Sequence, residues 1–332
     1  MKEYDVILAS GSEQLEERFE ELGYRVYVSE MNYDGKRMFP NADMYVRVSD
    51  VDELSGRRVV VIQSCTGSGP TEKEFYTTSD RVVELLLLLD MLRRPVIVRE
   101  VSHKEYECAE IEPPSRIDVI LTFQPFALQD KAFLTGEAVS ARWALEAIAE
   151  VSDRIWIVNP HAPASLDWIK QLVESGKLDS IDVTGDLIEF GAKKFGFTDY
   201  VVVTPDEGGQ ERFACRGFGK TRLSSYAVEL SGDLEVKDKD VIIIDDLTKS
   251  GETLLKAGER LFQQGAANVG MAVVHVLSLI DRGEELLEYL IERSEGMIVT
   301  TNTVFSSVFC VENPELTCDI VDSLVKALEN SV

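Results

Sequence analysis

Short runs of β-branched and aliphatic residues alternate with longer amphipathic stretches along the whole chain of 332 residues. Such alternation predicts parallel sheets with helices on both faces. The expected strands are 4–9, 59–63, 96–100 or 117–123, 155–158, 200–204, 241–244, 270–276 and 297–301. The expected helices are 13–22, 80–93, 136–150, 164–175, 253–264 and 314–328. We therefore expect an α/β protein.

Two halves of similar size are indicated, because the pattern restarts near residue 160 and the chain is long for one domain. With 45% hydrophobic residues it can form two cores. The expected domains are residues 1–160 and 161–312. The last segment, 313–332, is expected to be a helix that could pack on either half, the N-terminal one included.

The net charge of −25 excludes nucleic acids and anionic membrane surfaces as partners. The most apolar run, Leu85 to Leu89, is too short to cross a membrane. Five cysteines, an odd number without a CxxC pair, are expected to be reduced thiols. Because no signal peptide follows Met1, we expect a cytoplasmic protein.

Three expected strands end at polar residues: His161, Asp206, and the pair Asp245 and Asp246. In open parallel sheets, ligands bind beyond the carboxyl ends of the strands. These side chains are therefore expected to converge on a ligand.

The segment from Val241 to Thr253 has two acids after a buried strand and a Ser/Gly turn into a helix. Two carboxylates can accept hydrogen bonds from a vicinal diol such as that of ribose. Backbone N–H groups of residues 249–253 at the helix N-terminus, with the Ser250 and Thr253 hydroxyls, suit a phosphate. The alternative is an Asp-rich loop with a Thr N-cap and no ligand.

This segment resembles the phosphoribosyl diphosphate (PRPP) motif of phosphoribosyltransferases (PRTases) and PRPP synthetases. Seven further regions resemble the synthetases, in the order of that family: 39–47, 84–90, 126–140, 159–161, 205–209, 220–222 and 300–303. The chain thus resembles a divergent, archaeal-like ribose-phosphate pyrophosphokinase. The resemblance implies two domains of the type I PRTase fold, each a mostly parallel sheet flanked by helices.

The resemblance also implies the reaction. The family transfers the diphosphoryl group of ATP to ribose 5-phosphate with Mg²⁺, giving PRPP and AMP. Family members form dimers or hexamers with the ATP site shared between subunits, so a homo-oligomer is expected. By the same resemblance, Lys220, Arg222 and His161 would be catalytic, and His161 and Asp206 would lie at the Mg²⁺ ion. The residues implied at ribose phosphate are Asp245, Asp246, Lys249, Ser250, Gly251 and Thr253. Those implied at ATP are Phe39, Asn41, Asp43, Gln129 and Asp130.

Departures from the family pattern leave alternatives open. Leu128 replaces an arginine that contacts ATP, and leucine cannot donate to a phosphate. The other departures are Asn41, Lys249 and Glu252. Glu252 would repel a phosphate unless it points away or pairs, with Lys249 for example. The alternatives are a regulatory homologue that binds ribose phosphates or nucleotides, and an enzyme acting on a related sugar phosphate. His103 and His275 match no motif and receive no role.

Overall fold

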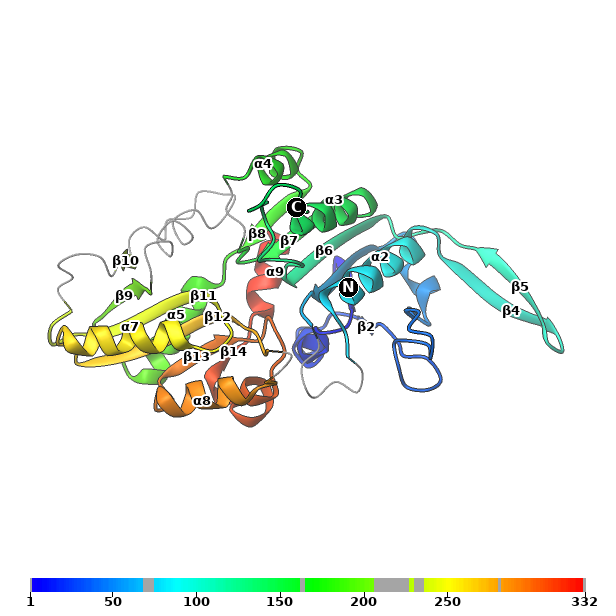
Figure 1. Ribbon diagram of the computed structural model, residues 1–332. Coiled ribbons are helices and arrows are strands. Elements are labelled where there is room, and N and C mark those ends of the chain that lie inside the picture. The colour runs from blue at the N-terminus through cyan, green and yellow to red at the C-terminus, as the bar shows by residue number, and fades with distance from the viewer. Residues whose placement is uncertain are drawn as a thin grey trace. The chain divides into compact units, whose positions relative to one another are not determined.

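The computed structural model describes residues 2–67, 75–161, 165–205, 227–229, 236–279 and 282–330. They form two compact units (Figure 1). Unit 1 comprises the described residues up to 157 together with 167–179. Unit 2 comprises those within 158–166 and from 180 onward.

Unit 1 is built on a six-stranded sheet in the order β2-β1-β3-β6-β7-β8. The strands are β1 (Tyr4–Leu8), β2 (Val26–Val28), β3 (Arg58–Ser64), β6 (Arg116–Phe123), β7 (Arg154–Val158) and β8 (Leu178–Ile181). The helices are α1 (Glu16–Glu21), α2 (Thr78–Arg93), α3 (Ser140–Val151) and α4 (Asp167–Glu174). Strands β2, β1, β3, β6 and β7 run parallel.

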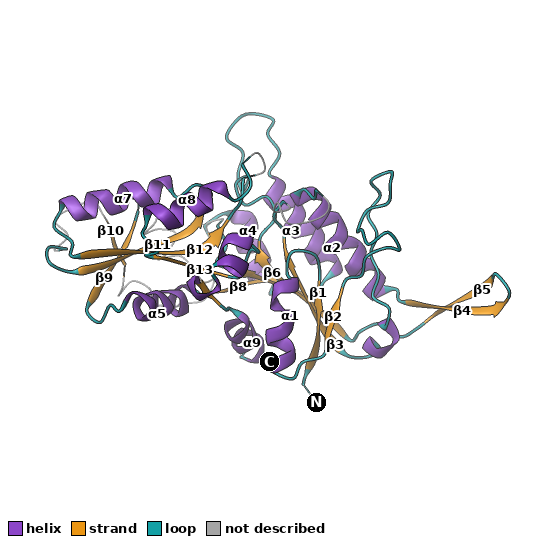
Figure 2. Cartoon of the chain, turned by 90° about the horizontal axis from the view of Figure 1, so that it is seen from below, coloured by secondary structure: helices purple, strands orange, loops and turns teal. Residues whose placement is uncertain are grey.

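The central strands of unit 1 are buried on both faces, which explains their continuous aliphatic sequences. Helices α2 and α3 pack side by side against the sheet (Figures 1 and 2). Helix α2 begins at a capping box in which Thr77 and Asp80 satisfy each other's backbone N–H groups. This cap fixes the start of the helix that carries Glu84 into the interior.

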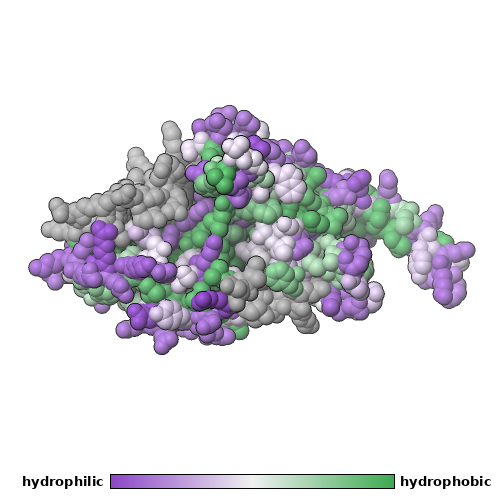
Figure 3. Space-filling model, in the orientation of Figure 1, coloured by the Kyte–Doolittle hydropathy of each residue, from purple (hydrophilic) through white to green (hydrophobic). Residues whose placement is uncertain are grey.

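A separate antiparallel hairpin, β4 (Val96–Ser102) and β5 (Glu105–Glu110), joins α2 to β6. The prediction that residues 96–100 could form a strand of the parallel sheet is wrong, because β4 pairs with β5 in a two-stranded sheet of its own. Figure 3 shows apolar side chains on the stem of the hairpin and polar ones at its tip. Val98 and Tyr106 are 60% and 63% exposed.

Unit 2 has a second six-stranded sheet, in the order β10-β9-β11-β12-β13-β14, and its strands run parallel. The strands are β9 (Tyr200–Thr204), β10 (Ala227–Glu229), β11 (Asp240–Thr248), β12 (Asn268–Val276), β13 (Ile298–Thr301) and β14 (Thr317–Cys318). The helices are α5 (Thr184–Phe195), α7 (Glu252–Gln263), α8 (Glu285–Arg293) and α9 (Val321–Glu329). The expected α/β architecture with two sheets flanked by helices is confirmed.

Helices α5 and α7 cover opposite faces of the unit 2 sheet (Figure 2). Gly270 on β12 lies under the Phe195 ring of α5, and an added Cβ there would come within 2.4 Å of that ring. On the other face, Gly258 of α7 lies against Met271. The core between α7, α8 and the sheet includes the buried side chains Leu254, Leu261, Met271, Leu287 and Leu290.

One predicted helix, 314–328, is wrong at its first turns, since the edge strand β14 precedes α9. In unit 2, Ser323 of α9 donates to the Asp186 carboxylate of α5 at 2.6 Å. Within the described part of the chain, no helix has both the length and the apolar character needed to cross a membrane.

Candidate functional site

Asp245 and Asp246 lie inside β11, not after it. The predicted strand 241–244 is too short, because β12 runs beside β11 as far as the pair Thr248–Val276 and continues the ladder. Asp246 is 1% exposed, and its N–H donates to Oδ1 of Asp245 at 2.9 Å. Successive side chains of a strand point to opposite faces, so the two carboxylates diverge.

His161 reaches the second of these carboxylates. Its Nδ1 lies 2.7 Å from Oδ2 of Asp246, although 85 residues separate them. The imidazole is 20% exposed, while the Asp246 side chain is buried. The hydrogen bond orients the ring and leaves Nε2 outside this pairing. Two of the predicted site residues are thus brought together.

Asn159 holds the backbone that presents His161. It has a φ of +40°, a conformation in which asparagine is enriched. Its amide donates to Asp182 and Thr184 at 3.1 and 2.9 Å and accepts from the Val183 N–H at 3.0 Å. Because the bonds to Thr184 and Val183 are buried, they hold the turn that precedes His161.

His275, which received no role from the sequence, supports the same turn. Its Nε2 lies 3.4 Å from the Asn159 carbonyl oxygen, and its Nδ1 lies 2.8 Å from the Thr303 hydroxyl. Sequence reasoning missed this contact and the Asn159 anchor. The available signal was the position of His275 and Thr303 at the carboxyl ends of neighbouring strands.

The turn between β11 and α7 depends on Gly251. This residue is the N-cap of α7, has a φ of +69°, and donates its N–H to the Thr248 hydroxyl at 2.9 Å. The Thr N-cap of the alternative without a ligand is not observed, since α7 already begins at Glu252 and Thr253 is exposed within its first turn. Lys249 and Ser250 are half-buried in the turn.

Glu252 pairs with Lys256, one helical turn later, at 2.6 Å. The suggested pairing with Lys249 is therefore replaced by an i, i+4 ion pair on the exposed surface of α7. The hydrogen bond and the charge of Lys256 lower the pKa of the Glu252 carboxyl below its usual value. This pair partly neutralises the carboxylate beside the turn.

The predicted nucleotide residues of unit 1 lie on two segments. Met38 and Met44 form an antiparallel bridge, and the turn between them contains Phe39, Asn41 and Asp43. The Asn41 amide donates to the Asp43 carboxylate at 2.5 Å, and both side chains are exposed. We call residues 38–44 the nucleotide hairpin.

Gln129 and Asp130 lie in the second segment, between β6 and α3. The Gln129 N–H donates to the Phe126 carbonyl oxygen at 2.8 Å. Asp130 is 8% exposed, and its backbone carbonyl accepts from Trp168 at 3.2 Å. Leu128, at the position where the resemblance expects arginine, is 51% exposed.

Asp206, Lys220 and Arg222 lie outside the described residues. Among the residues that the structure describes, no three or more His, Cys, Asp or Glu side chains gather in a way that could hold a metal ion. The described part of the candidate site therefore consists of the His161–Asp246 pair, Asp245 and the turn at Gly251.

In a comparison with known protein families, residues 198–312 match the family model described as a phosphoribosyl transferase domain. The chain is 30% identical over 247 residues to a ribose-phosphate pyrophosphokinase of Methanosarcina acetivorans, covering 71% of this chain and 73% of that protein. It is 26% identical over 308 residues to the ribose-phosphate pyrophosphokinase of Thermococcus kodakarensis, covering 90% and 93%.

A solved structure is also similar over nearly the whole chain. Phosphoribosylpyrophosphate synthetase from Mycobacterium smegmatis matches with a TM-score of 0.68 and 22% identity, covering 99% of this chain and 98% of that one. This likeness shows that both units share the fold of that protein.

Proposed function

Because the chain belongs to the ribose-phosphate pyrophosphokinase family, we propose that it transfers the diphosphoryl group of ATP to ribose 5-phosphate. In this reaction, O1 of the sugar attacks the β-phosphorus of ATP. The bond from that phosphorus to the α–β bridging oxygen breaks, AMP leaves, and O1 loses its proton. Such transfers depend on positioning and charge stabilisation rather than on a covalent enzyme intermediate.

The observation that carries the proposal is the pairing of His161 with Asp246 beside the turn at Gly251. Asp245, which is half-buried, would accept hydrogen bonds from the ribose hydroxyls, and the buried Asp246, on the other face of β11, would orient His161. The backbone N–H groups of Ser250, Glu252 and Thr253, at the N-terminus of α7, would hold the 5-phosphate, while the Gly251 N–H donates to Thr248. Half-buried Lys249 would add a positive charge there.

We propose Mg²⁺ as the metal ion. Carboxylate and phosphate oxygens are the hard ligands that this ion prefers, and a metal-binding histidine usually hydrogen-bonds a carboxylate through its other ring nitrogen. The bond from His161 to Asp246 has that form. His161 and Asp206 would hold the ion, which neutralises polyphosphate charge when bound. Lys220 and Arg222 would contact the transferred group.

We also propose that the protein acts as a cytoplasmic homo-oligomer, a dimer or a hexamer. The exposed Asn41 and Asp43 on the nucleotide hairpin support a contact that reaches ATP in a neighbouring subunit. Five cysteines, an odd number without a CxxC pair, support a reducing compartment. Sedimentation analysis that finds only monomers would contradict the shared site.

The test is a coupled assay of AMP formation from ATP, ribose 5-phosphate and Mg²⁺. We expect turnover by the purified protein, and roughly a tenfold to a hundredfold loss in Asp246→Asn, since the bond that orients His161 is weakened. Asp240→Asn, at the opposite end of the same strand, is the matched control and should retain activity. Absence of AMP with several sugar phosphates and nucleoside triphosphates would refute the proposal.

A further inference from the structure

Unit 1 has the same kind of strand-order reversal at which open α/β sheets bind ligands. Its sheet grows from β1 to β2 in one direction and from β3 through β6 in the other, so the reversal lies between β1 and β3. At the carboxyl ends of these two strands lie Ser10 and Gln63. Two buried charged side chains, Glu84 and Arg37, lie at these strand ends.

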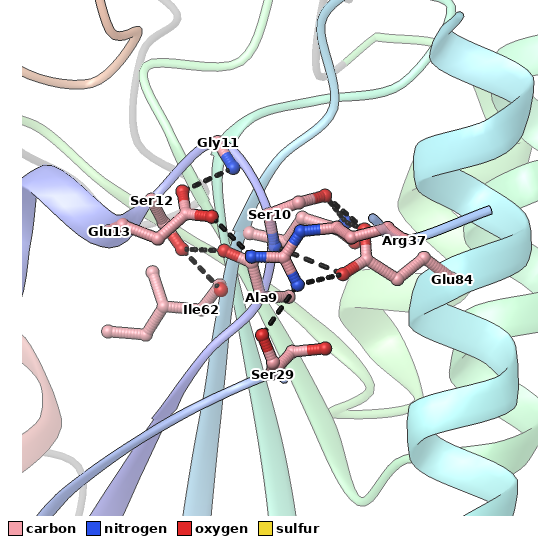
Figure 4. Close-up of polar contacts among 10 residues, drawn as sticks. Ala9, Ser10, Gly11, Ser12, Glu13, Ser29, Arg37, Ile62 and Glu84 are labelled. Carbon is pink, nitrogen blue, oxygen red and sulfur yellow. Dashed lines mark hydrogen bonds and ion pairs between the residues drawn. The ribbon is translucent and has the colours of Figure 1, made fainter. Parts of the chain in front are cut away.

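Glu84 of α2 accepts hydrogen bonds from both strand ends, and Figure 4 shows its carboxylate beside Ser10 and the Arg37 guanidinium. Its side chain is completely buried, and Oε1 accepts from the Ser10 N–H at 3.2 Å. Oε2 accepts from the Ser10 hydroxyl and from Nε2 of Gln63, the latter at 3.0 Å. One carboxylate therefore joins α2 to the ends of β1 and β3.

Arg37 supplies the opposite charge and is 3% exposed. Its Nη1 lies 3.4 Å from Oε1 of Glu84 and donates to the Ser29 carbonyl oxygen at 2.6 Å. Its Nη2 donates to Glu13 at 2.6 Å, and Glu13 in turn accepts from the Gly11 N–H at 2.7 Å. We call Ser10, Glu13, Arg37, Gln63 and Glu84 the Glu84 network.

Stability alone does not explain this arrangement. A buried ion pair costs several kcal/mol of desolvation per charge, and well-packed apolar side chains are often as stabilising. What the network provides is a defined geometry, because each charged group has several directional hydrogen bonds. Neutralising either Arg37 or Glu84 leaves the charge of the other one buried and poorly compensated.

The segment held in this way is the base of the nucleotide hairpin. The Arg37 carbonyl oxygen accepts from the Tyr45 N–H at 2.7 Å, directly before the Met38–Met44 bridge. The Phe39 N–H donates to the Asp43 carbonyl oxygen at 2.9 Å. Phe39 lies only two residues, about 7 Å of extended chain, from Arg37. The buried guanidinium thus fixes where the exposed tip lies on unit 1.

We propose that Arg37 and Glu84 are positioning residues that hold the nucleotide hairpin in the orientation that binds ATP. The inference rests on the proposed function. It assigns part of the ATP affinity to a buried ion pair that does not itself touch the nucleotide. The ribose-phosphate site of unit 2 should be insensitive to this pair.

The test compares Glu84→Gln, which keeps the shape of the side chain, with Arg37→Lys and Arg37→Met. We expect KM for ATP to rise roughly tenfold in Glu84→Gln and Arg37→Met, because small displacements of a binding group are costly. KM for ribose 5-phosphate should stay within about twofold of wild type. Arg37→Lys keeps the charge and should recover part of the ATP affinity.

Amide hydrogen exchange supplies a readout that needs no catalysis. Exchange at Phe39 and Tyr45 should accelerate roughly tenfold in Glu84→Gln, while amides of β11 and β12 keep their wild-type rates. The control is Glu21→Gln, which breaks an exposed pair with Arg18 in the same unit. It should change neither the KM for ATP nor the exchange rates of the Phe39 and Tyr45 amides.

A folded variant whose two KM values rise equally, or not at all, would overturn the inference. If Glu84→Gln does not fold, Arg37→Lys decides between these outcomes. If the wild-type protein forms no AMP, the proposed function fails, and hydrogen exchange together with calorimetric titration of ATP then decides the inference. Unchanged hairpin exchange would overturn it, and accelerated exchange with weakened ATP binding would support it.

Discussion

Replacing Gly251 with alanine should disturb the phosphate turn through one identifiable contact. A Cβ built on Gly251 would lie 2.3 Å from Cδ1 of Leu290 and 2.7 Å from its Cδ2. Leu290 belongs to α8 and is completely buried, so moving its side chain would disturb the packed core around it. The φ of +69° adds a second penalty for any residue with a Cβ.

The expected magnitude follows from these two terms. The left-handed conformation costs an alanine about 1–2 kcal/mol, and forcing extra atoms into a packed core costs about 1–3 kcal/mol. Gly251→Ala should therefore lower the free energy of unfolding by about 3 kcal/mol. Since the turn would also shift, KM for ribose 5-phosphate should rise roughly tenfold, which is equivalent to about 1.4 kcal/mol.

A double-mutant cycle with Leu290→Ala separates the two terms. Leu290→Ala alone should cost about 2–5 kcal/mol through the cavity it leaves. In the double variant the steric conflict is removed, so its total cost should be about 1–3 kcal/mol smaller than the sum of the single changes. The φ penalty should remain.

Urea unfolding followed by circular dichroism measures all four proteins of the cycle. Gly185→Ala is the control, because this glycine lies in α5, has no positive φ, and its added Cβ would meet nothing within 4 Å. It should leave stability unchanged or raise it by up to about 1 kcal/mol. Additive costs, within about 0.5 kcal/mol, would refute the argument that Leu290 is what the glycine accommodates.

Three further predictions concern unit 1. Burial raises the pKa of Asp5, but hydrogen bonds from Arg57 and Arg25 lower it more, so the net shift is downward. Asp5→Asn should cost about 3 kcal/mol in urea unfolding at pH 7. The difference in unfolding free energy between wild type and Asp5→Asn should have its full value above a pH of about 4. It should shrink as the pH falls through the lowered pKa of Asp5. Leu128→Arg should lower KM for ATP roughly tenfold by adding a phosphate donor. Ala42→Gly should raise the midpoint of urea unfolding, equivalent to about 1 kcal/mol, because Ala42 has a φ of +68°.

Each of these has a contrary outcome. A constant difference between wild type and Asp5→Asn from pH 7 to pH 3 would show that Asp5 ionisation contributes no stability. An unchanged KM for ATP in Leu128→Arg would show that this position no longer faces the nucleotide. A less stable Ala42→Gly would mean that the entropy of the unfolded glycine outweighs the relief of strain.

Local sequence was sufficient for the α/β class, because the aliphatic strands of both units are buried on two faces. It was insufficient for α5, since Gly185 and Gly191 weaken its helical signal although the helix packs firmly on the sheet. The run Val96–Val98 has strand propensity, but alternating charges after it belong to an exposed hairpin. Propensity cannot decide which partner a strand finds.

For the candidate site, sequence placed Asp245 and Asp246 after the end of a strand, whereas β11 continues to Thr248. The length of β11 depends on its ladder with β12, which is a tertiary property. The contacts of Asn159 with Thr184 and His275 join residues 25 and 116 positions apart. No spacing rule in one sequence predicts such pairs. The roles of the site residues remain predictions.

The β4–β5 hairpin offers a practical handle on the protein. Its ends lie close together, since Val96 pairs with Glu110 and the Ile111 N–H donates to the Pro95 carbonyl oxygen at 3.1 Å. The hairpin therefore leaves and rejoins unit 1 at neighbouring points, between α2 and β6. A short turn in its place, or a fluorescent label on exposed Cys108, can be introduced there without altering the order of the strands.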